Sequence, residues 1–108
     1  MSDYQSPITS NSKLSALRIP SKFKLYNHTV KVEDHSLRDA GKYGDWDQDT
    51  NTIRLFTNGV CDDVIIHTYY HELAHAMLDV IGRGDLSGDE PLVDQLGGLL
   101  AQLHDVTP

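Results

Sequence analysis

Residues 71–75 read His-Glu-Leu-Ala-His, and the spacing of the two histidines strongly restricts the secondary structure and the kind of site that this segment can form. Positions four apart in an α-helix lie one above the other, so His71 and His75 can reach the same metal ion while Glu72 projects beside them. A zinc site that carries its own general base has this arrangement. The alternative is a helix with two ordinary histidines, one of them capped or solvated.

The flanking sequence predicts a helix of about five turns around the motif. Asp62 and Asp63 suit a helix N-terminus, and Gly82 suits the position just after a helix end. The motif therefore falls in the middle of the helix, where the backbone is rigid. Apolar neighbours would exclude water from one side of the metal: Ile65, Leu73, Met77 and Val80.

Composition narrows the class of protein. The 108 residues suffice for a single domain with one modest core. A net charge of −7 with only nine scattered basic residues argues against a nucleic-acid partner. Cys61 is the only cysteine, so no internal disulfide forms, and we expect a cytoplasmic protein in which Cys61 is a small buried hydrophobe. No apolar stretch reaches the ~18 residues of a membrane span, and the polar start is not a signal peptide.

The rest of the chain predicts strands before the motif helix. Residues 1–19 are polar and aperiodic, so we expect a flexible arm there and a single domain over residues 20–108. Two short strands are expected around a turn at Asn27–His28. Residues 43–46 and 52–56 are expected to form a second hairpin.

A second helix is expected from about Asp89 to His104, after the glycine-rich stretch that follows Gly82. The expected fold class is α+β. It has a short antiparallel sheet of about three to four strands, packed on the motif helix and the C-terminal helix, as in a minimal zincin.

A catalytic zinc also needs a third protein ligand and an open position for water. Glu90 and Asp94 are four apart and share a face of the C-terminal helix, which the short link makes an antiparallel neighbour of the motif helix. We expect Glu90 to be the third ligand and Asp94 to accept the free ring N–H of a ligating histidine, His71. The alternative for Glu90 is a capping box over residues 87–90, in which its carboxylate bonds the N-cap amide.

Other polar residues have weaker claims on the site. His104 is a rival ligand near the end of the chain. His67 stands one turn before His71 and either lines a substrate cleft or is an ordinary exposed histidine. The negative oxygen of a tetrahedral intermediate needs a donor, for which Tyr43 is the candidate and Tyr69 and His67 are alternatives. Buried tyrosines more often satisfy their hydroxyl locally.

Two segments resemble the small phage and prophage metallopeptidases of the ImmA/IrrE type, minimal members of the gluzincins. The specific part is the motif within residues 68–77 and the Glu-three-spacer-Asp element within 90–96, and the resemblance covers about residues 19–105. It implies a Zn²⁺ site with a general base: His71, His75 and Glu90 as ligands and Glu72 as the base. It also implies a sheet edge that can hold an extended peptide, and a phage-encoded enzyme in the cytoplasm of a bacterial host.

The expected function is a zinc-dependent metallopeptidase hydrolysing a peptide bond in a narrow protein substrate, because the chain is too small for the deep walls of a digestive protease. Two departures from the family pattern argue against the prediction of a metallopeptidase. The spacing of fifteen from His75 to Glu90 is shorter than in larger gluzincins, and no downstream Tyr or His matches their transition-state stabiliser. The alternatives are a catalytically weak or inactive, metal-stabilised protein-interaction module of phage origin and a metal hydrolase acting on a non-peptide amide. Substrate and oligomeric state stay open.

Overall fold

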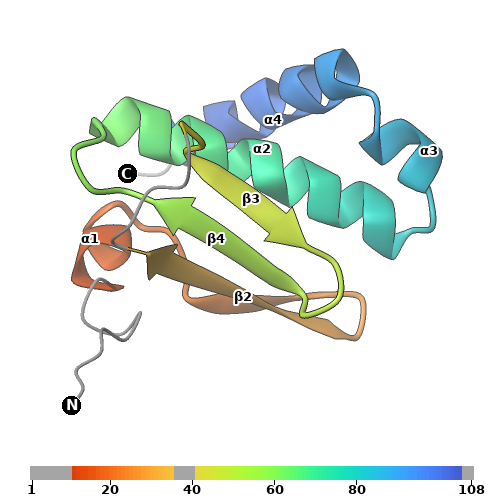
Figure 1. Ribbon diagram of the computed structural model, residues 1–108, viewed down its shortest axis with the longest axis horizontal. Helices are drawn as coiled ribbons and strands as arrows, with labels where there is room; N and C mark the ends of the chain where they lie inside the picture. Colours follow the sequence, from red (N-terminus) through yellow and green to blue (C-terminus); the bar gives the residue numbers. More distant parts are fainter. Residues whose placement is uncertain (1–10, 36–40, 106–108) are drawn as a thin grey trace.

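Strands and helices occupy separate parts of the chain, with the strands before the two long helices (Figure 1). The structure is a computed structural model that describes residues 11–35 and 41–105. In chain order, its elements are α1 (Asn11–Ala16), β1 (Lys22–Leu25), β2 (His28–His35), β3 (Gly44–Asp47), β4 (Thr52–Phe56), α2 (Asp62–Val80), α3 (Gly84–Ser87) and α4 (Glu90–Asp105). This is an α+β fold, which confirms the predicted class.

The four strands form one mixed sheet in the order β1-β2-β4-β3. Both predicted hairpins are present, because β1 pairs antiparallel with β2 and β3 pairs antiparallel with β4. The prediction of a purely antiparallel sheet is wrong at the central pair, since β2 and β4 are parallel. The second hairpin docks on β2 through its second strand, which leaves β3 at the edge. Local patterning does not specify which strand of a hairpin pairs with a third strand.

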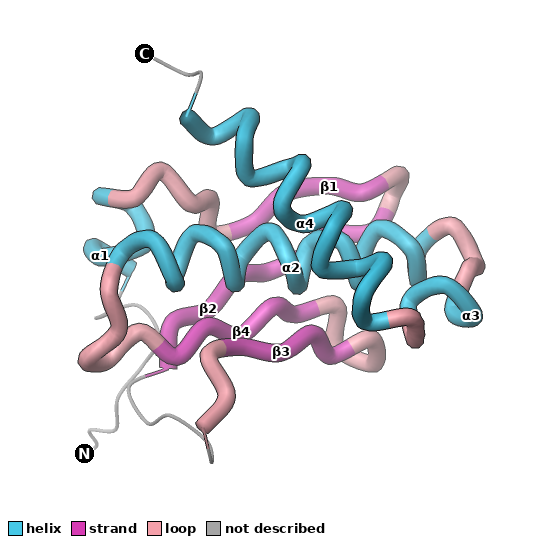
Figure 2. Tube along the Cα trace, turned by 90° about the horizontal axis from the view of Figure 1, so that it is seen from above, coloured by secondary structure: helices cyan, strands magenta, loops and turns pink. Residues whose placement is uncertain are grey.

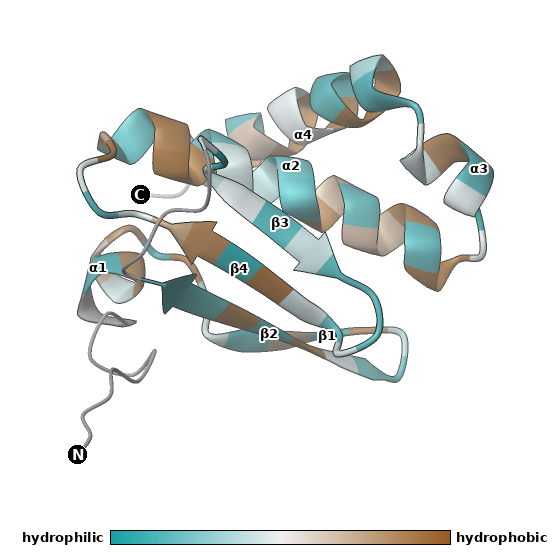
Figure 3. Ribbon diagram, viewed as in Figure 1, coloured by the Kyte–Doolittle hydropathy of each residue, from teal (hydrophilic) through white to brown (hydrophobic). Residues whose placement is uncertain are grey.

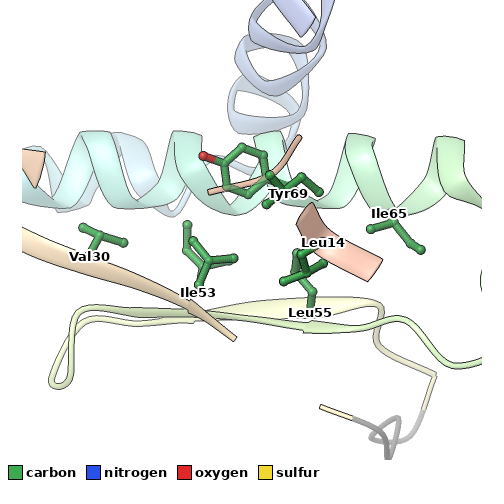
Figure 4. Packing of buried hydrophobic residues seen from close by; sticks show 8 residues of the cluster. Leu14, Val30, Ile53, Leu55, Ile65 and Tyr69 are labelled. Atoms are coloured by element: carbon green, nitrogen blue, oxygen red, sulfur yellow. The ribbon is translucent and has the colours of Figure 1, made fainter. Parts of the chain in front are cut away.

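One face of the sheet is apolar and covered by α2. Hydrophobic and hydrophilic residues alternate along β4 (Figure 3). Ile53 and Leu55 pack on this face, while Arg54 faces the opposite side, where Asp45 accepts two hydrogen bonds from it at 2.7 and 2.8 Å. From α2, Ile65 and Tyr69 pack onto the same core. Figure 4 shows these side chains between the helix and the strands. The sheet face of α2 is thus the main core of the molecule.

Residues 11–19 belong to this core. Leu14 and Ile19 are 2% and 3% exposed, and Leu17 packs beside them. Lys13 Nζ also lies 2.8 Å from Asp62 Oδ1 at the start of α2. The predicted flexible arm is therefore wrong for residues 11–19, because the apolar residues scattered in this polar segment close one end of the core. Residues 1–10 lie outside the described residues.

The C-terminal helix α4 packs on the side of α2 that faces away from the sheet, so the molecule has three layers (Figures 1 and 2). The sheet therefore packs on the motif helix α2, as predicted. The prediction that the sheet also packs on the C-terminal helix is wrong, because α4 packs on α2 instead. Ala74, Leu78 and Val93 are buried between the two helices. A Cβ added at Gly97 would lie 2.9 Å from the Cα of His71, so only a glycine allows the helices to approach this closely.

None of the helices in the described ranges is both long and apolar enough to cross a membrane.

Candidate metal centre

The three predicted ligands converge between α2 and α4. His71 Nε2 lies 3.1 Å from Glu90 Oε1, and His75 Nε2 lies 3.2 Å from Glu90 Oε2. Zinc bonds of about 2.0–2.1 Å in a tetrahedron place neighbouring ligand atoms roughly 3.3 Å apart, which matches each of these nitrogen–oxygen pairs. One ligand atom from each of the three residues lies within 4.8 Å of the other two. Among the residues that the structure describes, these three form the only group of His, Cys, Asp or Glu side chains with metal-ligand spacing. Two imidazoles and one carboxylate suit zinc and leave a fourth position for water.

Both histidines lie on α2, and Glu90 meets them from α4. His71 and His75 lie one turn apart on α2, with ring centroids 5.0 Å apart, because i and i+4 share a helix face. Glu90 is the first residue of α4. Its position depends on the short α3 segment turning the chain back against α2.

The start of α4 is capped by a residue other than the one considered from the sequence. Asp89 Oδ1 accepts a hydrogen bond from the backbone N–H of Leu92 at 3.2 Å. Ser87, the first residue of the possible capping box, instead lies 3.0 Å from His75 Nδ1 through its Oγ. Glu90 is thereby left to face the histidines, and the capping alternative is not what the chain forms.

Both histidines have a polar partner on the ring nitrogen that does not face Glu90. Asp94 Oδ1 lies 3.3 Å from His71 Nδ1, which is the contact expected from the sequence. Ser87, 8% exposed, supplies the corresponding oxygen for His75. Such partners fix the tautomer and orientation of a ligating imidazole. The sequence did not predict this role of Ser87, because the serine fits a local helix cap equally well. The only indication in the sequence was that a small polar residue lies between the two helices.

Glu72 lies beside the ligands and is 8% exposed. Burial raises the pKa of its carboxyl to about 7; the nearby His71 opposes the shift, while Asp45 and Glu90 add to it and Lys42 opposes it. A carboxyl with a pKa near neutrality can both accept and return a proton. A cation bound at the three ligands would favour the ionised form and lower this pKa.

Of the weaker candidates, His67 lies nearest to the predicted ligands. Its Nε2 lies 3.1 Å from Asp94 Oδ1, and its side chain is exposed. Tyr43 directly precedes the edge strand β3 and is 44% exposed. Its backbone carbonyl accepts a hydrogen bond from Phe56 N–H at 3.0 Å. Tyr43 is therefore attached to the sheet through its backbone while its ring is accessible.

The other candidates lie away from the metal centre. Tyr69 packs in the main core between α2 and the sheet, on the face of α2 opposite α4, and burial raises the pKa of its hydroxyl far above the usual value (Figure 4). His104 contacts the Tyr70 hydroxyl through Nδ1 and the Leu17 carbonyl through Nε2, both at 2.8 Å, and joins α4 to the segment after α1. Cys61 is exposed at the N-cap of α2, and its predicted burial is wrong.

No protein-family model matches the chain, and neither the comparison with curated proteins nor that with solved structures finds a match.

Proposed function

We propose that the protein is a zinc-dependent metallopeptidase that hydrolyses a peptide bond in a narrow protein substrate. The observation that carries this proposal is the convergence of His71, His75 and Glu90 beside a buried Glu72. Three ligands alone would suit a structural or a catalytic ion. The adjacent buried carboxyl of Glu72 adds the proton acceptor that hydrolysis needs.

The chain supplies the ligands, their orientation and the proton transfer. A zinc ion bound there would polarise the scissile carbonyl and acidify a water molecule. Glu72 takes the proton of the attacking water on its carboxylate and passes it to the leaving amide nitrogen. Asp94 and Ser87 hold the two imidazoles with their Nε2 atoms toward Glu90.

An extended peptide is the substrate class that the sheet supports. β3 pairs only with β4 among the described strands, so its other side is an edge to which a peptide can add by main-chain hydrogen bonds. This edge strand packs against the helix that carries the base: Trp46 Nε1 donates a hydrogen bond to Asp79 Oδ2 at 2.8 Å, and Gly44 lies against Thr68, one turn before Glu72. Tyr43 directly precedes this strand and remains the candidate donor to the oxyanion.

The second candidate function is a metal-stabilised protein-interaction module without catalysis. One observation favours it: large apolar side chains are exposed on α2, at its C-cap and on α4. They are Met77, Ile81, Leu99 and Leu103, with exposed fractions of 39%, 52%, 62% and 63%. Surface regions rich in such side chains are typical of protein contacts.

Glu72→Gln separates the two candidates. Because Glu72 is not a ligand, we expect this variant to keep its zinc and its fold while losing at least about 100-fold of its hydrolytic rate. Zinc content is measured by elemental analysis, and cleavage is measured by mass spectrometry on a library of peptides from bacterial proteins. Glu33→Gln is the control, because Glu33 lies on β2 and contacts His35 away from the ligands. Retained zinc with undiminished cleavage, or wild-type protein that cleaves nothing, would remove the enzyme proposal and leave the interaction module.

A further inference from the structure

One carboxylate oxygen of Asp94 contacts two histidines. Asp94 Oδ1 lies 3.3 Å from Nδ1 of His71 and 3.1 Å from Nε2 of His67. His67 lies one turn before His71 on α2, so both rings face α4 at the level of Asp94. The chain therefore carries a third histidine in line with the two predicted ligands, and Asp94 links it to the nearer ligand.

Asp94 needs such a partner to be an effective support for His71. Its side chain is 60% exposed, so by itself it would exchange among rotamers and hold the imidazole only part of the time. A second N–H donor on Oδ1 restricts those rotamers and keeps the oxygen directed at His71. His71 is then held with Nε2 toward Glu90, which is the orientation that metal binding requires.

We propose that His67 is a positioning residue for the metal centre, acting through Asp94 on the orientation of His71. The inference rests on the proposed metal site and adds to it a residue that would not itself touch the ion. It does not depend on hydrolysis, because the predicted consequence is the affinity for the metal.

A purely structural role for His67 makes a different prediction. Its side chain is half exposed and belongs to neither apolar cluster, so truncation removes little packing. Loss of packing would lower the stability of the fold, and any effect on zinc affinity would be the same with and without Asp94. A positioning role would lower zinc affinity only while Asp94 is present.

The test is a double-mutant cycle on the full-length protein, with zinc affinity measured by competition with a chelating dye. We expect His67→Ala to weaken zinc binding by about 2- to 5-fold, the range for an exposed charge-assisted contact. Asp94→Ala should weaken it by about 10- to 100-fold. In the Asp94→Ala background, His67→Ala should have no further effect. His28→Ala, exposed at the start of β2, is the control and should bind zinc as the wild type does.

A second measurement reports geometry. With Co²⁺ in place of zinc, His67→Ala should change the visible absorption of the bound ion when Asp94 is present and leave it unchanged in the Asp94→Ala background. Unaltered zinc affinity in His67→Ala, or an equal loss with and without Asp94, would overturn the positioning role. Wild-type protein that binds no zinc would overturn both this inference and the metal site, whereas zinc binding without cleavage would overturn only the peptidase.

Discussion

The two faces of α2 are built differently. Its sheet face carries Ile65 and Tyr69 into a cluster of eight buried residues that joins α1 with two strands, β2 and β4. Its α4 face has a cluster of only three buried residues, next to the polar contacts of His71 and His75. Since apolar burial is the main source of folding free energy, the sheet face holds the fold together. The α4 face positions the candidate ligands, and under the proposed function its stability depends more on a bound ion.

On the α4 face, where the apolar cluster is smaller, the backbones of α4 and α2 lie unusually close together. Gly97 allows the backbone of α4 to lie against His71. This contact fixes the position of α4 along α2, and with it the positions of Glu90 and Asp94 relative to the histidines. A helix held mainly by large apolar side chains would stand farther away. The geometry of the candidate site therefore depends on a residue without a side chain.

The largest effect on stability should come from the sheet face. Ile53→Ala removes a fully buried side chain from the main core and should lower the free energy of unfolding by about 2–5 kcal/mol, measured by urea denaturation. Zinc affinity of the folded protein should not change. Leu78→Ala, at the α4 face, should cost less because its side chain is 9% exposed, yet it should weaken zinc binding. If Leu78→Ala lowered stability more than Ile53→Ala, or if only Ile53→Ala weakened zinc binding, the two faces of α2 would not differ in the way described.

Removal of metal should act on the α4 face. Ligands from two helices converge on one ion, so zinc at about 100 times its dissociation constant should stabilise the folded state by roughly 2.7 kcal/mol. A chelator should then lower the melting temperature by roughly 10–20 °C, observed by circular dichroism. Glu90→Ala should abolish most of this response. An unchanged melting temperature on chelation of zinc-loaded protein would show that the ion does not join the helices.

The two adjacent glycines of α4 provide a matched pair. Gly97→Ala places a methyl group against the backbone of His71 and should cost about 1–3 kcal/mol by overpacking, with weaker zinc binding. Gly98→Ala meets nothing within 4 Å and should stabilise the helix by up to about 1 kcal/mol, with zinc affinity unchanged. Thermal melting and zinc titration of both variants check this. Equal stability and equal zinc affinity of the two variants would mean that the close approach of α4 to His71 does not determine the geometry of the site.

The smallest effect concerns a buried carboxyl on the sheet. Asp34 is 3% exposed and accepts a hydrogen bond from Thr57 Oγ1 at 2.7 Å; burial raises the pKa of Asp34, although the Thr57 contacts oppose the shift. The folded protein therefore holds this proton more tightly than the unfolded chain does. Stability from this group is full below the unfolded pKa and is lost as pH rises through the folded value.

Asp34→Asn removes that titration while keeping an acceptor for Thr57. Relative to the variant, wild-type protein should become less stable as the pH rises above about 4, in urea titrations with chelator present. A difference that stays constant with pH would show that Asp34 titrates alike in both states.

The sequence alone determined the features that depend on neighbours along the chain. The acidic start and the glycine stop of the motif helix predicted α2, observed as Asp62–Val80, and the strand patterns predicted both hairpins. The spacing of residues 71–75 and of Glu90 and Asp94 predicted which side chains share a helix face. Helical periodicity and end signals are local, so one sequence suffices to recognise them.

Only the tertiary structure decided which elements meet. The parallel pairing of β2 with β4, the burial of Leu14 and the attachment of His104 to the Leu17 carbonyl join residues far apart in the chain. At the site, the local signal was ambiguous: Ser87 could cap α4, but packing brings its hydroxyl to His75 and leaves the cap to Asp89. Gly97 gave no signal of its role, because the need for a missing Cβ arises only once another helix lies against it.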